Sequence, residues 1–434
     1  MDRRSTDTLA SWWRWALGCF VLAAATGVVF RVGLAAGGLP VDLTFANVRR
    51  AHSHLMFFSW VSPALMALIA LYVVRRTGVA PGRPIALILV ANLVLGLASF
   101  MPFLLDGYGT TAVFDVEMPL SIIFSTSAMF GWYAFAVWYW RRRRHLEATT
   151  AIALWDVSVA ALVVSSLGAW ARGALMGLGV EDPLWTDGSI HLFLGYFSDG
   201  WLALGALAIV HEHLGVEMRG RRRVWTGLMV AGLPLTFVLG MPRDIVPDGV
   251  WSLATLAGLF VGLGLLGHLA VLWRNRRGGF WTFALVALGA KALANVAFVV
   301  PAVAAWAQDA GLRLMYLHVL FLGCVTVVLV EAARHRWGNV GAAQSRWMQA
   351  AVAVLLVTMV PTTGLWPSGS GRALLWVAAA GSFAPVCVAI WIFVTARNDD
   401  ADVGQDFSED GRPRLDDRAG ASPPGVSPHR TGGR

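Results

Sequence analysis

Three histidines, His52, His191 and His318, occupy similar places near the start of long hydrophobic stretches. An ionisable side chain inside a membrane span costs about 2.5–3.5 kcal/mol on insertion scales, so each histidine is a candidate functional residue. Neutral imidazole is a good ligand for haem iron or copper, and helix bundles build such sites from facing side chains. The alternative is that each histidine packs in the core with a local hydrogen bond.

Other ionisable or polar side chains lie in the same hydrophobic stretches. Lys291 sits near the middle of one stretch and should face the bundle, paired or neutral. Asp199 follows His191 by about two helical turns and therefore lies roughly on the same face. We expect Asp199 and Lys291 to form a structural polar pair, with proton relay as the alternative. His54 projects about 200° away from His52 around a helix, so we expect it to be a packing or hydrogen-bonding residue.

The composition indicates that membrane-spanning helices must position these residues. The chain has 434 residues, of which 57% are hydrophobic and 14% charged, with a mean hydropathy of +0.62. Soluble proteins carry roughly a quarter charged residues. We predict an all-α integral membrane protein with about twelve transmembrane helices, because each apolar stretch can cross about 30 Å of hydrocarbon. The predicted spans are roughly 12–36, 48–74, 84–105, 113–140, 149–174, 188–210, 222–241, 248–273, 280–304, 311–333, 347–367 and 372–396.

Arginine clusters follow every second predicted span, and the loops between them are often acidic. The positive-inside rule then makes the arginine-rich loops and both chain termini cytoplasmic. With this orientation, His52, His191 and His318 all lie in the outer third of the bilayer. The net charge of +8 is explained by these loops, so we expect the lipid bilayer as partner and no nucleic acid. Residues 1–396 form the predicted transmembrane domain, and 397–434 have the composition of a disordered cytoplasmic tail.

Short motifs on the second and tenth spans are similar to those of haem–copper oxidase subunit I. The second span opens Ala51-His52-Ser53-His54-Leu55-Met56-Phe57-Phe58, followed by Pro63, and resembles the family's Ala-His, Met, aromatic and Pro pattern. The tenth span reads Tyr316-Leu317-His318-Val319-Leu320-Phe321-Leu322-Gly323 and resembles the family's His-x-His and Gly pattern. The family has twelve helices with both termini inside. The resemblance implies that His52 and His318 hold a low-spin haem b.

The sequence departs from the family where the family reduces oxygen. Tyr316 stands where the resemblance would place the high-spin haem ligand, and both copper-site histidines of the seventh helix are replaced, by Pro242 and Arg243. Copper is therefore not expected. Tyrosine can ligate ferric haem, which leaves room for a second haem. His191 resembles a metal ligand of the cbb-type oxidases and nitric oxide reductases, whereas another register would place Ser198 there.

Four arginines on or near the predicted outer face could hold haem propionates: Arg49, Arg50, Arg243 and Arg313. Arginine pairs bidentately with carboxylates. Such a role would explain why Arg49 and Arg50 break the positive-inside pattern. The alternative is snorkelling to lipid phosphates, to which arginine side chains are suited.

The resulting hypothesis is a haem protein of the bacterial inner membrane that transfers electrons without an intact oxygen-reducing centre. An iron with two histidine ligands has no open position, so enzymatic activity, as a terminal oxidase or nitric oxide reductase-like oxidoreductase, would need a second metal. An electron-donor cytochrome or partner subunit of a respiratory chain is the expected protein partner. One alternative is an NnrS-type nitric oxide stress metalloprotein. Another is a secondary transporter without haem that uses Lys291, Asp199 and Asp156.

Overall fold

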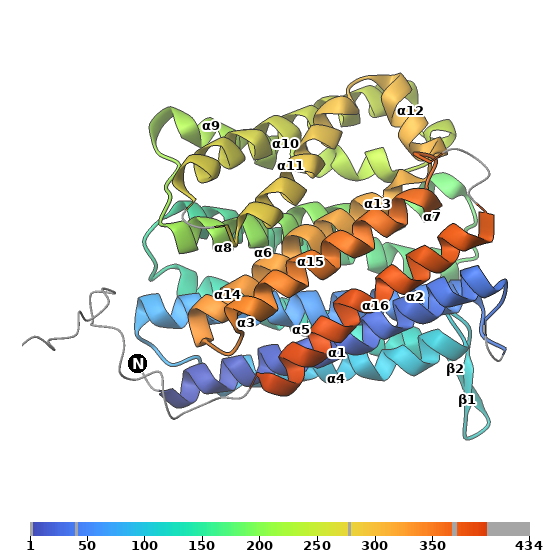
Figure 1. Ribbon diagram of the computed structural model, residues 1–434, viewed down its shortest axis with the longest axis horizontal. Helices are drawn as coiled ribbons and strands as arrows, with labels where there is room; N and C mark the ends of the chain where they lie inside the picture. Colours follow the sequence, from blue (N-terminus) through green and yellow to red (C-terminus); the bar gives the residue numbers. More distant parts are fainter. Residues whose placement is uncertain (1–2, 40–41, 277–278, 367–370, 397–434) are drawn as a thin grey trace, which may run out of the picture. The chain divides into compact units, whose positions relative to one another are not determined.

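The computed structural model describes residues 3–39, 42–276, 279–366 and 371–396 (Figure 1). Within these residues, ten helical segments are long and apolar enough to cross a membrane, so the chain is a multi-pass membrane protein. They comprise residues 7–36, 45–77, 82–105, 120–143, 150–177, 183–214, 220–240, 248–275, 312–337 and 371–395. The predicted tail at 397–434 lies outside the described residues.

The α-helices and the short helical and extended elements have the following bounds. The α-helices are α1 (Arg3–Ala36), α2 (Phe45–Leu55), α3 (Ser62–Thr77), α4 (Gly82–Leu105), α5 (Leu120–Arg143), α6 (Thr150–Gly177), α7 (Pro183–Gly195), α8 (Leu204–Leu214), α9 (Arg223–Thr236), α10 (Asp248–Asn275), α11 (Thr282–Ala297), α12 (Pro301–Asp309), α13 (Leu312–His318), α14 (Val327–Trp337), α15 (Ala342–Met359) and α16 (Gly371–Thr395). The π-helical turns are η1 (Met56–Val61), η2 (Tyr196–Ala203) and η6 (Val319–Thr326). The 3₁₀ turns are η3 (Gly220–Arg222), η4 (Phe237–Gly240), η5 (Arg243–Ile245) and η7 (Val360–Thr362), and the strands are β1 (Thr111–Val113) and β2 (Val116–Met118).

Ten of the twelve predicted spans correspond to these long apolar segments. The prediction for 280–304 is wrong as a single helix, because α11 ends at Ala297 and α12 begins at Pro301. Proline lacks the backbone N–H that a continuing helix would use, and it is well suited to a helix start. The predicted span 347–367 contains most of α15, which ends at Met359 and is not among the ten segments.

A β-hairpin replaces the predicted start of the span at 113–140. Strands β1 and β2 pair antiparallel, and Phe114 and Asp115 between them both have positive φ. Two such residues form the turn whose twist matches a two-residue hairpin. Helix α5 therefore begins only at Leu120, directly after Pro119. The described residues are otherwise helical, as predicted, and we call the end of the bundle that carries this small hairpin the hairpin end.

Three segments form the centre of the bundle, and we call them the central helices: α2–η1–α3, α7–η2–α8 and α13–η6–α14. Every residue of η1 is buried, as is α3 from Ser62 to Val74. Helix α14 packs against both α3 and α8, and η2 packs against η6. The outer helices pair around this centre, α1 with α16, α4 with α5 and α9 with α10 (Figure 1). The residues predicted to carry function lie mainly on the central helices.

Each central helix contains a π-helical turn, and the three turns meet. Phe57 of η1 packs against Phe197 of η2 at 5.1 Å between ring centroids and against Phe321 of η6 at 5.3 Å. The indole of Trp60 donates a hydrogen bond to Thr326 Oγ1 at 3.1 Å. π-Helical turns are rare and are frequent at functional sites, because they redirect the side chains that follow. The centre of the bundle is therefore the strongest candidate region for a functional site.

Candidate functional site

His52 of α2 is held against the backbone of α1. Its Nδ1 lies 2.7 Å from the carbonyl oxygen of Ala23, which can only accept, so Nδ1 carries the proton and donates it. A Cβ atom added at Gly27 would lie 3.1 Å from Cε1 of the imidazole. A glycine there lets the backbone of α1 approach the ring closely. The half-buried imidazole is thus fixed in orientation by two groups of α1.

His318 is the last residue of α13 and directly precedes η6. Its Nδ1 donates to the carbonyl oxygen of Leu314, one turn earlier, at 2.8 Å. The ring is half-buried, as that of His52 is. His318 interacts electrostatically with His52, and both interact with Arg31 of α1. The structure therefore brings the two predicted haem ligands into one neighbourhood, which also contains an arginine that sequence analysis did not select.

The hydrogen bonds of His52 and His318 prepare both rings to bind a metal. When Nδ1 carries the proton, Nε2 of a neutral imidazole presents its lone pair. Neither Nε2 has a hydrogen-bond partner among the described residues. Histidine ligands of metals commonly donate their other ring N–H to a backbone carbonyl in this way, which fixes tautomer and orientation. The donor set fits a low-spin haem iron.

His54 lies on the other side of α2 and has a different environment. Its ring stacks on Phe103 at 3.8 Å between centroids, and its Nδ1 donates to the carbonyl oxygen of Arg50 at 2.9 Å. Phe58 stacks on the same ring. The prediction of a packing and hydrogen-bonding residue is confirmed. His54 is consequently a useful control for experiments on His52.

The predicted pairing of Asp199 and Lys291 is confirmed. Nζ of Lys291 lies 3.0 Å from Oδ1 of Asp199, and the two side chains are 1% and 11% exposed. Nζ also donates to the hydroxyl of Tyr316 at 2.6 Å, and that hydroxyl donates to Asp199 at 3.5 Å. The three side chains form one buried polar triad. The predicted role of Tyr316 as a haem ligand stays a prediction, and here its hydroxyl is held by Lys291.

His191 of α7 is paired with an arginine from α13. The guanidinium of Arg313 lies 3.1 Å from Nε2 and 3.3 Å from Nδ1 of the imidazole, through its two terminal nitrogens. A Cβ atom at Gly240 would approach Nδ1 to 2.3 Å, so only glycine fits beside the ring. In the described segments no group of three or more His, Cys, Asp or Glu residues could hold a metal ion. The predicted role of His191 as a metal ligand stays a prediction that would require Arg313 to move.

The other predicted arginines are engaged in separate places at the hairpin end. Arg50 donates to Asn47 at 3.0 Å and lies over the ring of Tyr108 at 4.7 Å. Arg49 is exposed and interacts electrostatically with Arg313. Whether these arginines hold propionates stays a prediction.

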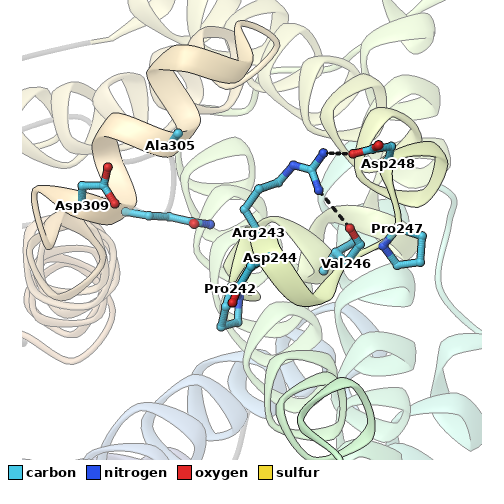
Figure 2. A pocket seen from close by; sticks show the side chains of 9 residues that line it. Pro242, Arg243, Asp244, Val246, Pro247, Asp248, Ala305 and Asp309 are labelled. Carbon is cyan, nitrogen blue, oxygen red and sulfur yellow. Dashed lines mark hydrogen bonds and ion pairs between the residues drawn. The ribbon is translucent and has the colours of Figure 1, made fainter.

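Arg243 stabilises its own loop. Figure 2 shows its guanidinium directed at Asp248, with which it forms an ion pair, and at the carbonyl oxygen of Val246, to which it donates at 2.9 Å. The guanidinium also lies over the ring of Trp251, 5.2 Å from the centroid. It borders a hollow of about 590 Å³ between this loop and α12. Three partners already orient this side chain, so it is tied to its loop.

A cavity of about 370 Å³ lies beside the buried triad, and we call it the Lys291 cavity. Its polar lining comes from α7, η2, α9, α11, α12 and α13, and most of its wall is apolar. The polar or charged lining residues are His191, Ser198, Asp199, Thr236, Lys291, Asn295, Gln308, Arg313 and Tyr316. A mainly apolar cavity with a few converging polar groups is the usual form of a small-molecule site.

A buried chain of histidines near the other end of the bundle was missed by sequence analysis. His211 lies close in sequence to an arginine-rich loop, a position typical of a solvated residue. Its ring is buried, with Nδ1 donating to Val216 at 2.8 Å and Nε2 lying 2.8 Å from Nδ1 of His268. Nε2 of His268 in turn lies 3.0 Å from Oγ1 of Thr226. The charged and polar neighbours Glu212 and His213 make His211 look solvated in the sequence. Its burial depends on His268, which comes from the distant helix α10.

The chain matches no protein-family model, and a comparison with curated proteins finds no significant match. The His52 and His318 pair and the Lys291 cavity are the two features of the molecule that bear on its function.

Proposed function

We propose that the protein is a membrane haem protein in which His52 and His318 hold one low-spin haem b for electron transfer. The observation that carries the proposal is the matched state of the two imidazoles. Each donates its Nδ1 proton to a backbone carbonyl oxygen, and each leaves Nε2 without a protein partner in the described chain. They come from two different central helices and interact electrostatically. Bound haem would supply a one-electron couple, and its electron donor would be a cytochrome or partner subunit.

The residues around the pair support this function through charge and rigidity. Arg31 interacts with both imidazoles and provides a positive charge that suits the carboxylates of a haem. Gly27 and Ala23 fix the ring of His52, and the turn of α13 fixes the ring of His318. Ligands held in this way need no rearrangement on binding a metal. A similar role for Arg49 and Arg50 belongs to the proposal.

The proposal includes a twelve-helix arrangement similar to oxidase subunit I, in the bacterial inner membrane with both termini cytoplasmic. The two shorter helical segments, α11–α12 and α15–η7, then complete the twelve. The oxygen-reducing centre of that family would be absent, because Pro242 and Arg243 replace copper ligands and Tyr316 is held by Lys291. The protein would then pass electrons without turning over a gas. A nitric oxide stress metalloprotein of the NnrS type is the related alternative.

Absorbance spectroscopy of the purified protein tests the haem proposal. We expect a Soret band and, on reduction, a split α/β pair, both lost in His52→Ala and in His318→Ala. His54→Ala is the matched control, since it removes an imidazole of the same helix that packs on Phe103. Size-exclusion chromatography shows whether each variant is folded. A folded, colourless wild-type protein, or spectra unchanged in both ligand variants, would contradict the proposal.

A secondary transporter without haem is the second candidate, and the buried ion pair beside the Lys291 cavity favours it. Charged pairs that line a cavity inside a membrane commonly mark substrate or proton pathways. Asp156, the third residue predicted for such a pathway, instead forms an ion pair with Arg143 at 2.8 Å and accepts from Tyr139. It lies with its partners near the ends of α5 and α6, away from the triad. A folded wild-type protein without a Soret band would favour this candidate.

A further inference from the structure

Two polar groups of the Lys291 cavity have capacity for a ligand. Among the residues that the structure describes, Nδ2 of Asn295 has no hydrogen-bond partner, although this residue is only 4% exposed. Arg313 forms no ion pair in the same part of the chain, and Asp187 acts on it only through a longer-range interaction. A buried amide without a hydrogen-bond partner is energetically unfavourable. An unpartnered amide and an unpaired guanidinium in one cavity indicate that something else binds there.

The charge of the lining favours an anion. Among the described lining residues Asp199 is the only acidic one, and Lys291 already neutralises it at 3.0 Å. The guanidinium of Arg313 therefore has no ion-pair partner in the described lining, and its charge is offset only by the longer-range interaction with Asp187. His191 accepts from it and holds it in place, while a guanidinium has five N–H donors, so donors remain for a ligand. A carboxylate is the group that matches a guanidinium in geometry and charge.

The size and walls of the cavity favour a small ligand with an apolar body. Its volume of about 370 Å³ equals that of about a dozen water molecules at ~30 Å³ each. This volume suits a molecule of about ten non-hydrogen atoms. The apolar walls include Leu194, Phe237, Leu239, Phe298 and Leu317. A bare inorganic anion would leave these walls without contact, whereas an aromatic or branched carboxylate would cover them.

We propose that the Lys291 cavity binds a small amphipathic organic monoanion. Its carboxylate pairs with Arg313, its apolar body lies among the leucine and phenylalanine walls, and Asn295 supplies a further hydrogen bond. His191 acts as a positioning residue for the guanidinium. This site is separate from the haem site, because neither His52 nor His318 lines the cavity. The proposal concerns binding and does not depend on haem.

Fluorine NMR with 4-fluorobenzoate tests the proposal on the full-length protein in a non-ionic detergent. We expect saturable broadening of the fluorine signal at millimolar or lower probe concentration, reversed by benzoate. Benzamide has the same ring without the charge, and acetate has the charge without the ring, so both should compete at least tenfold more weakly. Inorganic phosphate should not compete. Equal competition by benzamide would refute the anion, and equal competition by acetate or phosphate would refute the apolar body.

Three variants connect the signal to the cavity. Arg313→Gln should weaken binding ten- to a hundredfold, as expected for loss of a hydrogen bond to a charged group, and Arg313→Lys should restore part of it. Asn295→Leu should weaken binding severalfold. The control Arg172→Gln removes an arginine of α6 that does not line the cavity, and it should bind as the wild type does. Unchanged binding in Arg313→Gln, or an equal loss in Arg172→Gln, would overturn the assignment.

Two further arms separate related explanations. Oleate in lipid vesicles that competes while benzoate does not would overturn the size argument and indicate a lipid chain. Absorbance spectra of the same samples report on haem independently, and Arg313→Gln should leave them unchanged. Absence of probe binding by a wild-type protein with intact haem spectra would overturn this inference alone, whereas saturable probe binding by a colourless wild-type protein would overturn the haem proposal alone.

Discussion

The buried ion pair between Asp199 and Lys291 should show strong thermodynamic coupling. Its charged atoms lie 3.0 Å apart and Lys291 is almost fully buried. At an effective dielectric constant of about 20, this separation corresponds to about 5.5 kcal/mol of attraction. Removing one partner leaves the other charge buried and unpaired, at a cost of about 3–5 kcal/mol. We therefore expect Asp199→Asn and Lys291→Met each to lower the free energy of unfolding by about that amount.

The double variant Asp199→Asn/Lys291→Met is the decisive measurement. It leaves neither charge behind, and replacing a buried ion pair by uncharged groups is often close to neutral. We expect it to cost only about 1 kcal/mol, against about 6–10 kcal/mol for the sum of the two single variants, which gives a coupling energy of about 5–9 kcal/mol. Reversible unfolding in mixed detergent micelles, followed by tryptophan fluorescence, provides the three free energies. Additive single effects would refute the reasoning, since additivity would mean that the two charges do not interact in the folded protein.

Three further predictions concern the packing of the central helices and the ion pairs at their ends, each measured by the same unfolding assay. Trp60→Phe should cost about 1 kcal/mol less in a Thr326→Val background than in the wild type, because the hydrogen bond at 3.1 Å is already lost there while the loss of packing of the buried ring is the same in both. Gly96→Val should destabilise by about 1–3 kcal/mol, since even a Cβ atom there would lie 2.1 Å from Oγ of Ser59, whereas valine at exposed Gly173, which has open space, should be tolerated. Glu331→Ala should cost about 3 kcal/mol, because its carboxylate is 0% exposed and receives hydrogen bonds from three neighbours; an unchanged midpoint would show that these bonds contribute nothing.

Hydropathy predicted the spans well because length and composition alone decide whether a helix can cross a bilayer. The pairing of Asp199 with Lys291 was also predictable, since two opposite charges at membrane depth have few other partners. Local interruptions of the helices were harder to predict from the sequence. The hairpin at 111–118 was hidden in a run of apolar residues, and the break before Pro301 was overlooked within a continuous hydrophobic stretch.

Contacts between distant helices could not be predicted from the sequence. The carbonyl oxygen of Ala23 that orients His52 belongs to α1, and a backbone acceptor has no side-chain signature. Arg313 was selected for its position near the predicted outer face, but its contact with His191 depends on how α7 and α13 face each other. The π-helical turns also have no recognisable sequence pattern, because a π-helical turn of buried apolar residues has the same composition as an α-helical one.

Each central helix contains one π-helical turn, which places one extra residue within an otherwise α-helical segment. One residue more or less in an α-helix turns everything beyond it by about 100°. A π-helical turn holds one extra residue and takes up that rotation, so the α-helical parts on either side keep the directions of an unbroken α-helix. In α13–η6–α14, the part with His318 can therefore lie near His52 while the part with Glu331 faces its ion pairs. Deleting one residue within η6 should convert the π-helical turn to an α-helical one and leave the directions of both parts unchanged.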